Sequence, residues 1–419
     1  MYRHRSTGGI VLSLVGILAV LAALALPAGA RDSDRQTHGD PAELAVVDSP
    51  ETSEGSGGAL PMCPILATPA ADTLPTSLRW SVEEASDLGC DVVQLSPGDY
   101  EITAGTIDIA TDMTLVGLDG ASSTTVRSST DDQPLFLVSA GDVSIVGLHI
   151  STDGQDARLV GQPQFPDCSP CRLSITDSVF EGANTSGAGA AIQTSGELTI
   201  ERSEFANNTS SAGGAIFVSG SLAVVDSEFT NNTAMNLDGG AISSRGEVSL
   251  EGVVFTNNSA PIGGALSSDN INPEMNEVVI SDSSFVNNSA RVGGAFTASR
   301  AHISVDGSLF DSNEAEEFGR AILVRRELQL EISASSFVGN LGLAAALIEV
   351  FPEAPFPQSV RVENTLLDDR EASPIFFSST FGEAPSIELV HVTAFSAGCL
   401  LYTSPSPRDR TRSRMPSSA

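Results

Sequence analysis

Short stretches in which apolar and polar residues alternate recur along the middle of the chain. Examples are ELTIERSEF, SLAVVDSEF, EVSLEGVVF, EVVISDSSF and HISVDGSLF, each of which ends on a phenylalanine. Alternation with a period of two is typical of strands that bury one of their faces. No repeat contains a segment long enough for a helix, and we therefore predict an all-β structure.

The phenylalanines mark a repeat. They occur at Phe180, Phe205, Phe229, Phe255, Phe285, Phe310 and Phe337, in steps of 25, 24, 26, 30, 25 and 27 residues. A period that tolerates insertions indicates a solenoid, in which each repeat buries its apolar face only against its neighbours. Short strands at this period predict a single right-handed parallel β-helix, whose coils pair through backbone hydrogen bonds.

An asparagine follows each phenylalanine except the first by three residues. The set is Asn208, Asn232, Asn258, Asn288, Asn313 and Asn340. In stacked coils these side chains would lie roughly 4.8 Å apart, so each amide can donate to one neighbour and accept from the other. We also expect these asparagines to adopt the left-handed backbone that the corner of a coil demands.

Paired glycines follow the asparagines, and an apolar residue comes two positions after each pair. The pairs are Gly213–Gly214, Gly239–Gly240, Gly263–Gly264 and Gly293–Gly294. They predict a tight bend that a Cβ would obstruct. These apolar residues are Ile216, Ile242, Leu266 and Phe296, and Ile322 takes the same place in the next repeat, where Arg320 replaces the second glycine; we expect all five to point inward. All of these repeated residues are explained by folding, and we interpret the motif as scaffold.

Charged residues also fall into columns outside the predicted core. Asp177, Arg202 and Asp226 stand three positions before successive phenylalanines, and we expect Arg202 to lie between the two acids. Glu204 and Glu228 would stack as like charges. They either extend into water or share a calcium ion.

The chain before the repeats is assigned to three parts. Arg3 and Arg5 precede an apolar run and the small-residue site AGA, so residues 1–30 are interpreted as a signal peptide. Residues 31–60, rich in Asp, Gly, Ser and Pro, are expected to form a disordered leader. Residues 61–94 are predicted to form an N-terminal cap.

A short helix is expected within that cap. Leu78, Val82, Ala85 and Leu88 have helical spacing in residues 75–89, where Ser77 precedes them and a glycine follows. A helix placed before a solenoid can cover its open end and block edge-to-edge aggregation. The β-helix itself is predicted over residues 95–398.

The last residues have a different character. Residues 399–419, CLLYTSPSPRDRTRSRMPSSA, resemble the conceptual translation of a transposase-type sequencing adapter. We interpret them as read-through and not as native sequence.

Charge and composition exclude several classes of function. The formal net charge is −32, and all basic residues are arginines because the chain has no lysine. This excludes a Schiff-base lysine, a lysine base and a phosphate-loop lysine. The acidic balance also disfavours nucleic acid as a partner. Beyond the signal, no apolar stretch is long enough to span a bilayer.

Four cysteines remain when the tail is excluded: Cys63, Cys90, Cys168 and Cys171. An even set in an exported protein indicates two disulfides. Of the three pairings, Cys63–Cys90 with Cys168–Cys171 is the most local. The CSPC stretch has two alternatives, half of a metal site and a redox motif.

The recurring FTNN and GGAI stretches resemble the polymorphic outer membrane protein repeat, which combines an F-x-x-N motif with a G-G-A-[ILV] motif. This resemblance covers residues 176–325. The stretch TSLRWSVEEA is similar to the cap of secreted bacterial β-helix proteins that bear a C-S-L-R-E-A signature, although Thr76 replaces its Cys and Trp80 and Ser81 replace its Glu-Ala. The resemblance implies a secreted or surface-displayed β-helix, often within an adhesin-like protein.

We therefore expect a non-catalytic module for adhesion or for matrix or glycan binding, secreted or displayed on the outer membrane surface. Its expected partners are glycans or other surface proteins, with no nucleic acid, and the module is expected to be a monomeric part of a longer chain. No cofactor is expected, with calcium as the alternative already named. The alternative function is a polysaccharide lyase or glycoside hydrolase acting on acidic polysaccharide, for which Asp368–Asp369 and Arg325–Arg326 are the suggestive pairs.

Overall fold

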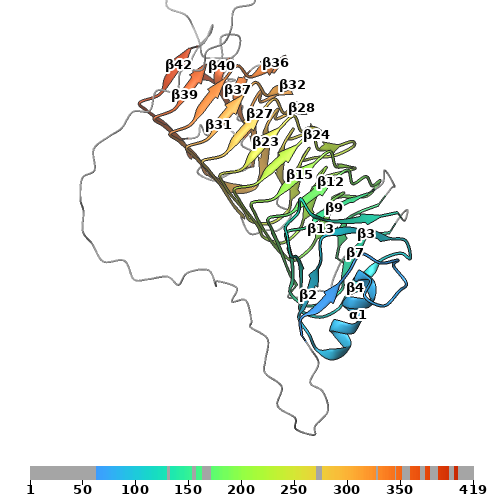
Figure 1. Ribbon diagram of the computed structural model, residues 1–419. Coiled ribbons are helices and arrows are strands. Elements are labelled where there is room, and N and C mark those ends of the chain that lie inside the picture. Colours follow the sequence, from blue (N-terminus) through green and yellow to red (C-terminus); the bar gives the residue numbers. More distant parts are fainter. Residues whose placement is uncertain are drawn as a thin grey trace, which may run out of the picture. The chain divides into compact units, whose positions relative to one another are not determined.

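The computed structural model describes residues 63–129, 133–152, 157–162, 171–269, 276–326, 329–344, 346–351, 359–368, 373–377, 386–395 and 401–403. All of them belong to one compact unit, which spans residues 59–419. Within these ranges the chain winds into a stack of parallel coils with a single short helix near the N-terminal end (Figure 1). The predicted fold class is confirmed.

Four parallel sheets run along the stack, and neighbouring strands of a sheet come from successive coils. Sheet A contains β1 (Ile65–Ala67), β2 (Val92–Leu95), β5 (Met113–Gly117), β8 (Val143–Val146), β11 (Arg172–Thr176), β14 (Glu197–Glu201), β18 (Leu222–Val225), β22 (Val248–Glu251), β26 (Asn276–Ser281), β30 (Ala301–Asp306), β34 (Gln329–Ser333), β38 (Ser359–Glu363) and β41 (Ser386–Val390). Sheet B contains β3 (Gly98–Ile102), β6 (Thr124–Ser128), β9 (His149–Thr152), β12 (Val179–Glu181), β15 (Glu204–Ala206), β19 (Glu228–Thr230), β23 (Val254–Thr256), β27 (Ser284–Val286), β31 (Leu309–Asp311), β35 (Ser336–Val338), β39 (Leu366–Asp368) and β42 (Thr393–Phe395).

The other two sheets meet at the glycine pairs. Sheet C contains β4 (Ile107–Ile109), β7 (Phe136–Val138), β10 (Val160–Gly161), β13 (Ile192–Thr194), β17 (Ile216–Val218), β21 (Ile242–Ser244), β25 (Leu266–Asp269), β29 (Phe296–Ser299), β33 (Ile322–Arg325), β37 (Ala346–Phe351), β40 (Ser373–Phe377) and β43 (Leu401–Thr403). Sheet D is shorter and contains β16 (Thr209–Ser210), β20 (Thr233–Ala234), β24 (Ser259–Ile262), β28 (Ser289–Val292), β32 (Glu314–Phe318) and β36 (Leu341–Gly342).

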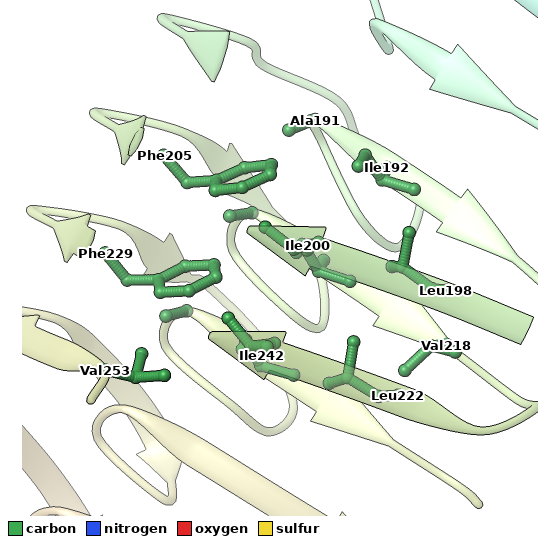
Figure 2. Packing of buried hydrophobic residues seen from close by; sticks show 14 of the residues in the cluster. Ala191, Ile192, Leu198, Ile200, Phe205, Val218, Leu222, Phe229, Ile242 and Val253 are labelled. Carbon is green, nitrogen blue, oxygen red and sulfur yellow. The ribbon is translucent and has the colours of Figure 1, made fainter. Parts of the chain in front are cut away.

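The repeated phenylalanines form a continuous stack in the core. From Phe180 to Phe337 the centroids of neighbouring rings are 4.6 to 5.1 Å apart, and the rings are tilted by no more than 16°. All of these side chains are fully buried. Figure 2 shows Phe205 over Phe229, with Ile242 and Leu222 beside them. Offset stacking adds to the hydrophobic gain from burying the rings.

The six asparagines of the repeat form a ladder of hydrogen bonds, which we call the Asn ladder. Each Nδ2 donates to the Oδ1 of the next asparagine at 2.9 to 3.0 Å. The same Oδ1 also accepts from the backbone N–H of the preceding asparagine, and each Nδ2 donates to a phenylalanine carbonyl. These side chains are 0–2% exposed. Every amide inside the ladder is therefore satisfied without water.

The left-handed corner lies one residue earlier than the sequence predicts. Asn207, Asn231, Asn257 and Asn287 have φ of 54° to 57°, whereas the Asn ladder residues are not among those with positive φ. Ser312 and Gly339 take the left-handed position in the next two coils. The two asparagines of each pair therefore differ in role, because the first turns the backbone and the second joins the coils.

A second ladder of hydroxyl groups runs beside the first. Ser203 Oγ accepts from the backbone N–H of Ser178 and donates to the carbonyl of Glu201. The same arrangement recurs in most coils, at Ser227, Ser283, Ser308 and Ser335. These hydroxyls satisfy buried backbone donors at the turn between sheets A and B.

The helix α1 (Leu78–Leu88) covers the first coil. Ser77 Oγ accepts from the N–H of Trp80, and Gly89 ends the helix at φ 71°. Leu78, Val82 and Ala85 are buried, and α1 packs against β1, β2 and β4. Apolar residues at this spacing form one face of a helix, which explains how α1 covers the end of the core.

Polar groups hold the helix in place. Arg79 pairs with buried Asp72 and donates to the carbonyls of Gly105 and Thr106 at 2.6 and 2.7 Å. Asp72 also accepts from two backbone N–H groups that follow β3. A disulfide joins Cys63 to Cys90, which flank β1 and α1. These bonds tie the helix to the strands beneath it.

The Asn ladder gives a test of coil stacking. Asn258→Ala removes the acceptor of Asn232 and the donor to Asn288. We expect a loss of about 1–3 kcal/mol for each buried group left without a partner. Thermal and urea unfolding followed by circular dichroism measure this loss.

The neighbouring residue supplies the control. Asn257 is exposed with φ 57°, a conformation that glycine adopts readily, so Asn257→Gly is expected to stay within about 0.5 kcal/mol of the wild type. Equal effects of the two substitutions would contradict the roles assigned to the pair.

Candidate functional site

The glycine pairs form an inward bend between sheets D and C. Gly239 has φ 67°, which favours glycine, and a Cβ on Gly240 would lie 1.9 Å from the carbonyl oxygen of Gly264 in the next coil. The two glycines of a pair are therefore needed for different reasons. The bend also brings the outer face of sheet C close to the end of sheet D, since a Cβ on Gly293 would lie 2.3 Å from Thr297 Cγ2.

In seven neighbouring strands of sheet C, from β13 to β37, the residue that follows the inward-pointing isoleucine, leucine or phenylalanine of the repeat faces away from the core. We call these residues the outer row, and they are in register with one another. The outer row comprises Gln193, Phe217, Ser243, Ser267, Thr297, Leu323 and Glu349. Because they lie at the bend, all except Phe217 are buried although they belong to the outer face.

A pocket with a volume of about 160 Å³ opens at this bend. It is lined by residues of sheet C and the end of sheet D, namely Asp238, Ile262, Ser267, Ser268, Asp269, Thr297, Ala298, Ser299, Leu323, Arg325 and Arg326. Two carboxylates and two guanidinium groups thus share one concavity with several hydroxyls. Such convergent polar groups are typical of ligand sites.

Hydroxyl groups fix the carboxylate of Asp238. Ser243 Oγ donates to its Oδ1 at 3.1 Å, and Ser267 Oγ lies 3.3 Å from its Oδ2. Thr297 Oγ1 in turn donates to Ser267 Oγ at 3.1 Å. The three hydroxyls belong to neighbouring coils, so coil stacking positions this carboxylate. A carboxylate has about four acceptor sites, and Asp238 keeps capacity for a ligand hydroxyl.

A buried carboxyl group lies next to the pocket in the outer row. Glu349 is in register with Leu323, is 2% exposed and accepts from the N–H of Gly319 at 2.9 Å. Burial raises the pKa of Glu349, while this hydrogen bond and the charge of Arg325 oppose the rise. The cost of desolvating a charged group is the larger effect.

The raised pKa predicts how stability depends on pH. Native Glu349 keeps its proton at a pH where the unfolded chain has lost it, so its contribution to stability falls as the pH rises above 4.5. We expect Glu349→Gln to raise the melting temperature near pH 7, and the difference from the wild type to shrink toward pH 4.

Thermal unfolding across this pH range measures the effect. The control is Glu277→Gln, because Glu277 is exposed in β26. Its profile should follow that of the wild type. A stabilising effect of Glu349→Gln that grows toward acid pH would contradict the assignment.

The structure separates the two charged pairs that the sequence suggests for catalysis. Arg325 and Arg326 line the pocket at the end of β33. Asp368 ends β39 in sheet B, and Asp369 lies outside the described residues. The acidic partners in the pocket are Asp238 and Asp269, which the sequence analysis did not single out. Their positions in the repeat could have indicated them, because Asp238 directly precedes a glycine pair and Asp269 ends a strand of sheet C.

The remaining sequence-predicted residues lie elsewhere. Arg202 forms an ion pair with Asp177 at 2.8 Å, as the sequence predicts. Its second partner is Glu201 at 3.0 Å, and not the predicted Asp226. The Glu204 and Glu228 positions are in register, as the column requires. In the described part of the chain, no group of three or more His, Cys, Asp or Glu side chains is arranged to hold a metal ion.

The second pair of cysteines is only partly described. Cys171 is disulfide-bonded, whereas Cys168 lies outside the described residues.

Within the described ranges, no helix has the length and apolar character needed to cross a membrane.

Comparison with solved structures finds a similar fold in a glucanase domain. One similar structure is the catalytic domain of a GH87 α-1,3-glucanase in complex with tetrasaccharides, at a TM-score of 0.52 and 11% identity, covering 83% of this chain and 69% of that chain. Another is the A-module of the mannuronan C-5 epimerase AlgE4 from Azotobacter vinelandii, at 0.49 and 14%, covering 81% and 96%. At 11% identity the likeness to the glucanase domain is one of fold alone.

No curated protein matches the sequence. Residues 167–340 match the family model described as the right handed beta helix region. The matched range contains the whole Asn ladder and the pocket. Together with the sheet topology, this match shows that the chain is a right-handed parallel β-helix.

Proposed function

We propose that this protein binds polysaccharide in the pocket at the bend between sheets D and C. The observation that carries the proposal is the convergence of Asp238, Asp269 and Arg325 on one concavity. Carboxylates accept hydrogen bonds from sugar hydroxyls, and guanidinium groups donate to ring and hydroxyl oxygens. The outer face of the stack is a continuous surface on which a long glycan can lie beyond the pocket itself.

The shared fold gives limited support. The α-1,3-glucanase domain of similar fold holds tetrasaccharides. This likeness extends to the fold alone. The proposal therefore rests on the pocket of this chain.

We also propose that the protein works outside the cytoplasm. The disulfide between Cys63 and Cys90 supports an oxidising compartment. The apolar N-terminal run and the resemblance to the polymorphic outer membrane protein repeat and to the cap with a C-S-L-R-E-A signature support secretion or display at the cell surface.

Blocking the pocket tests the binding proposal. Ser299 is half-buried and lines the pocket, so Ser299→Phe is expected to fill it and abolish retention on insoluble polysaccharides. The control is Ser249→Phe, which places the same side chain on the exposed face of β22 in sheet A.

Co-sedimentation with a panel of neutral and acidic polysaccharides gives the readout. The wild type and Ser249→Phe should be retained by the same member of the panel. The proposal is wrong if the wild type is retained by none, or if Ser299→Phe binds like the control.

Cleavage of the bound glycan is the second candidate function. Asp238 and Asp269 line the same pocket, and paired carboxylates acting as general acid and general base or nucleophile carry most glycoside hydrolysis. Release of reducing ends from the retained polysaccharide would show turnover. Loss of turnover in both Asp238→Asn and Asp269→Asn, with binding kept, would assign the protein to the enzymes. Binding without turnover would leave it a binding protein.

A further inference from the structure

Two arginines of the described part of the chain lack the polar partners that most others have. Hydrogen bonds or ion pairs engage Arg79, Arg127, Arg158, Arg172, Arg202, Arg291, Arg320 and Arg361. Arg300 and Arg326 are also engaged by neighbours. Arg245 and Arg325 form neither a hydrogen bond nor an ion pair through their side chains, and the polar influence on Arg325 is the longer-range charge interaction with Glu349. Both lie on the outer face of sheet C.

An aromatic ring holds Arg245 in place. Its guanidinium carbon lies 5.6 Å from the centroid of the Phe217 ring, a cation–π arrangement. Its Nε is buried without a hydrogen-bond partner. The terminal nitrogens are not among these buried atoms, so they are the donors that a ligand can reach. A guanidinium group fixed in this way is preorganised for a carboxylate or sulfate group.

Arg325 occupies the same column of sheet C as Arg245, three coils later. Ser244 is in register with Ser268, and Asp269 is in register with Ser299, which pairs with Arg325. Arg245 follows Ser244 and therefore continues this column. The two arginines are roughly 14 Å apart along the stack, the height of three strand spacings.

Two carboxylates face the stretch between Arg245 and Arg325. Asp269 lies in their column, and Asp238 faces the same pocket with hydroxyl groups around it. An anionic group placed there would be repelled, whereas a neutral sugar would offer hydroxyls to both carboxylates. This stretch of the outer face thus has a cationic side chain at each end and hydrogen-bond acceptors in the middle.

We infer that this face selects a glycan whose anionic groups are spaced along the chain, with uncharged sugars between them. One anionic group binds Arg245, another binds Arg325, and a neutral sugar lies over Asp238 and Asp269. The inference rests on the proposed function and names its ligand class. A glycan with a charge on every sugar would bring anionic groups against the two carboxylates, and a neutral glycan would offer no anionic group to either guanidinium.

Titration calorimetry with the full chain at low salt tests this inference. The probes are oligosaccharides of hyaluronan, in which uronate and neutral amino sugars alternate, of polygalacturonate, and of a neutral β-glucan. We expect hyaluronan oligosaccharides to bind about tenfold more tightly than the other two, and added salt to weaken their binding.

Variants identify the two positions. Arg245→Gln and Arg325→Gln should each weaken hyaluronan binding about tenfold. Phe217→Leu, which removes the ring under Arg245, should act in the same direction as Arg245→Gln. The control is Arg361→Gln, which removes one positive charge from a partly exposed side chain of sheet A and should bind as the wild type does.

The outcomes separate this inference from the proposed function. If all three probes bind equally and Ser299→Phe abolishes their binding, the pocket binds glycans but the charge selection is wrong. An unchanged affinity in Arg245→Gln would also overturn the inference. If the polysaccharide panel shows no binding at all, the proposed function fails first.

Discussion

The hydrogen bonds between buried amide side chains are the constraint on which the rest of this β-helix depends. Asn232 donates to a side chain and a carbonyl and accepts from a side chain and a backbone N–H. These partners are present only when successive coils place an asparagine at the same height. A slip by one residue would bury polar groups without partners, at a cost of about 1–3 kcal/mol each. The ladder therefore fixes the angular position of the six coils that carry it.

The pocket is a consequence of this register. Asp238, Asp269 and Arg325 come from different coils, and they share one concavity because each coil is held directly over the previous one. The glycine pairs add the bend that turns a flat outer face into a hollow. Scaffold and site thus use different residues of the same short motif.

Repetition made the fold predictable. The steps between phenylalanines predict the coils, and the asparagine column lies in the core as an uninterrupted ladder. The left-handed residue was misplaced because two adjacent asparagines suit either role, and propensity alone cannot separate them. The sequence does not mark the serine ladder, because Val253 interrupts it and because serine is common at turns. The site was harder to predict because the outer-row side chains differ from coil to coil, so no column marks them.

The two glycines of each bend have a consequence for how such a protein can evolve. They and the ladder residues recur in coil after coil, whereas the outer row contains Phe217, Ser243 and Leu323 at equivalent positions. A new side chain at that position leaves the backbone geometry intact, and duplication of a whole coil would lengthen the surface by one step. Ligand preference can therefore diversify through single substitutions or copied modules while the architecture is inherited unchanged.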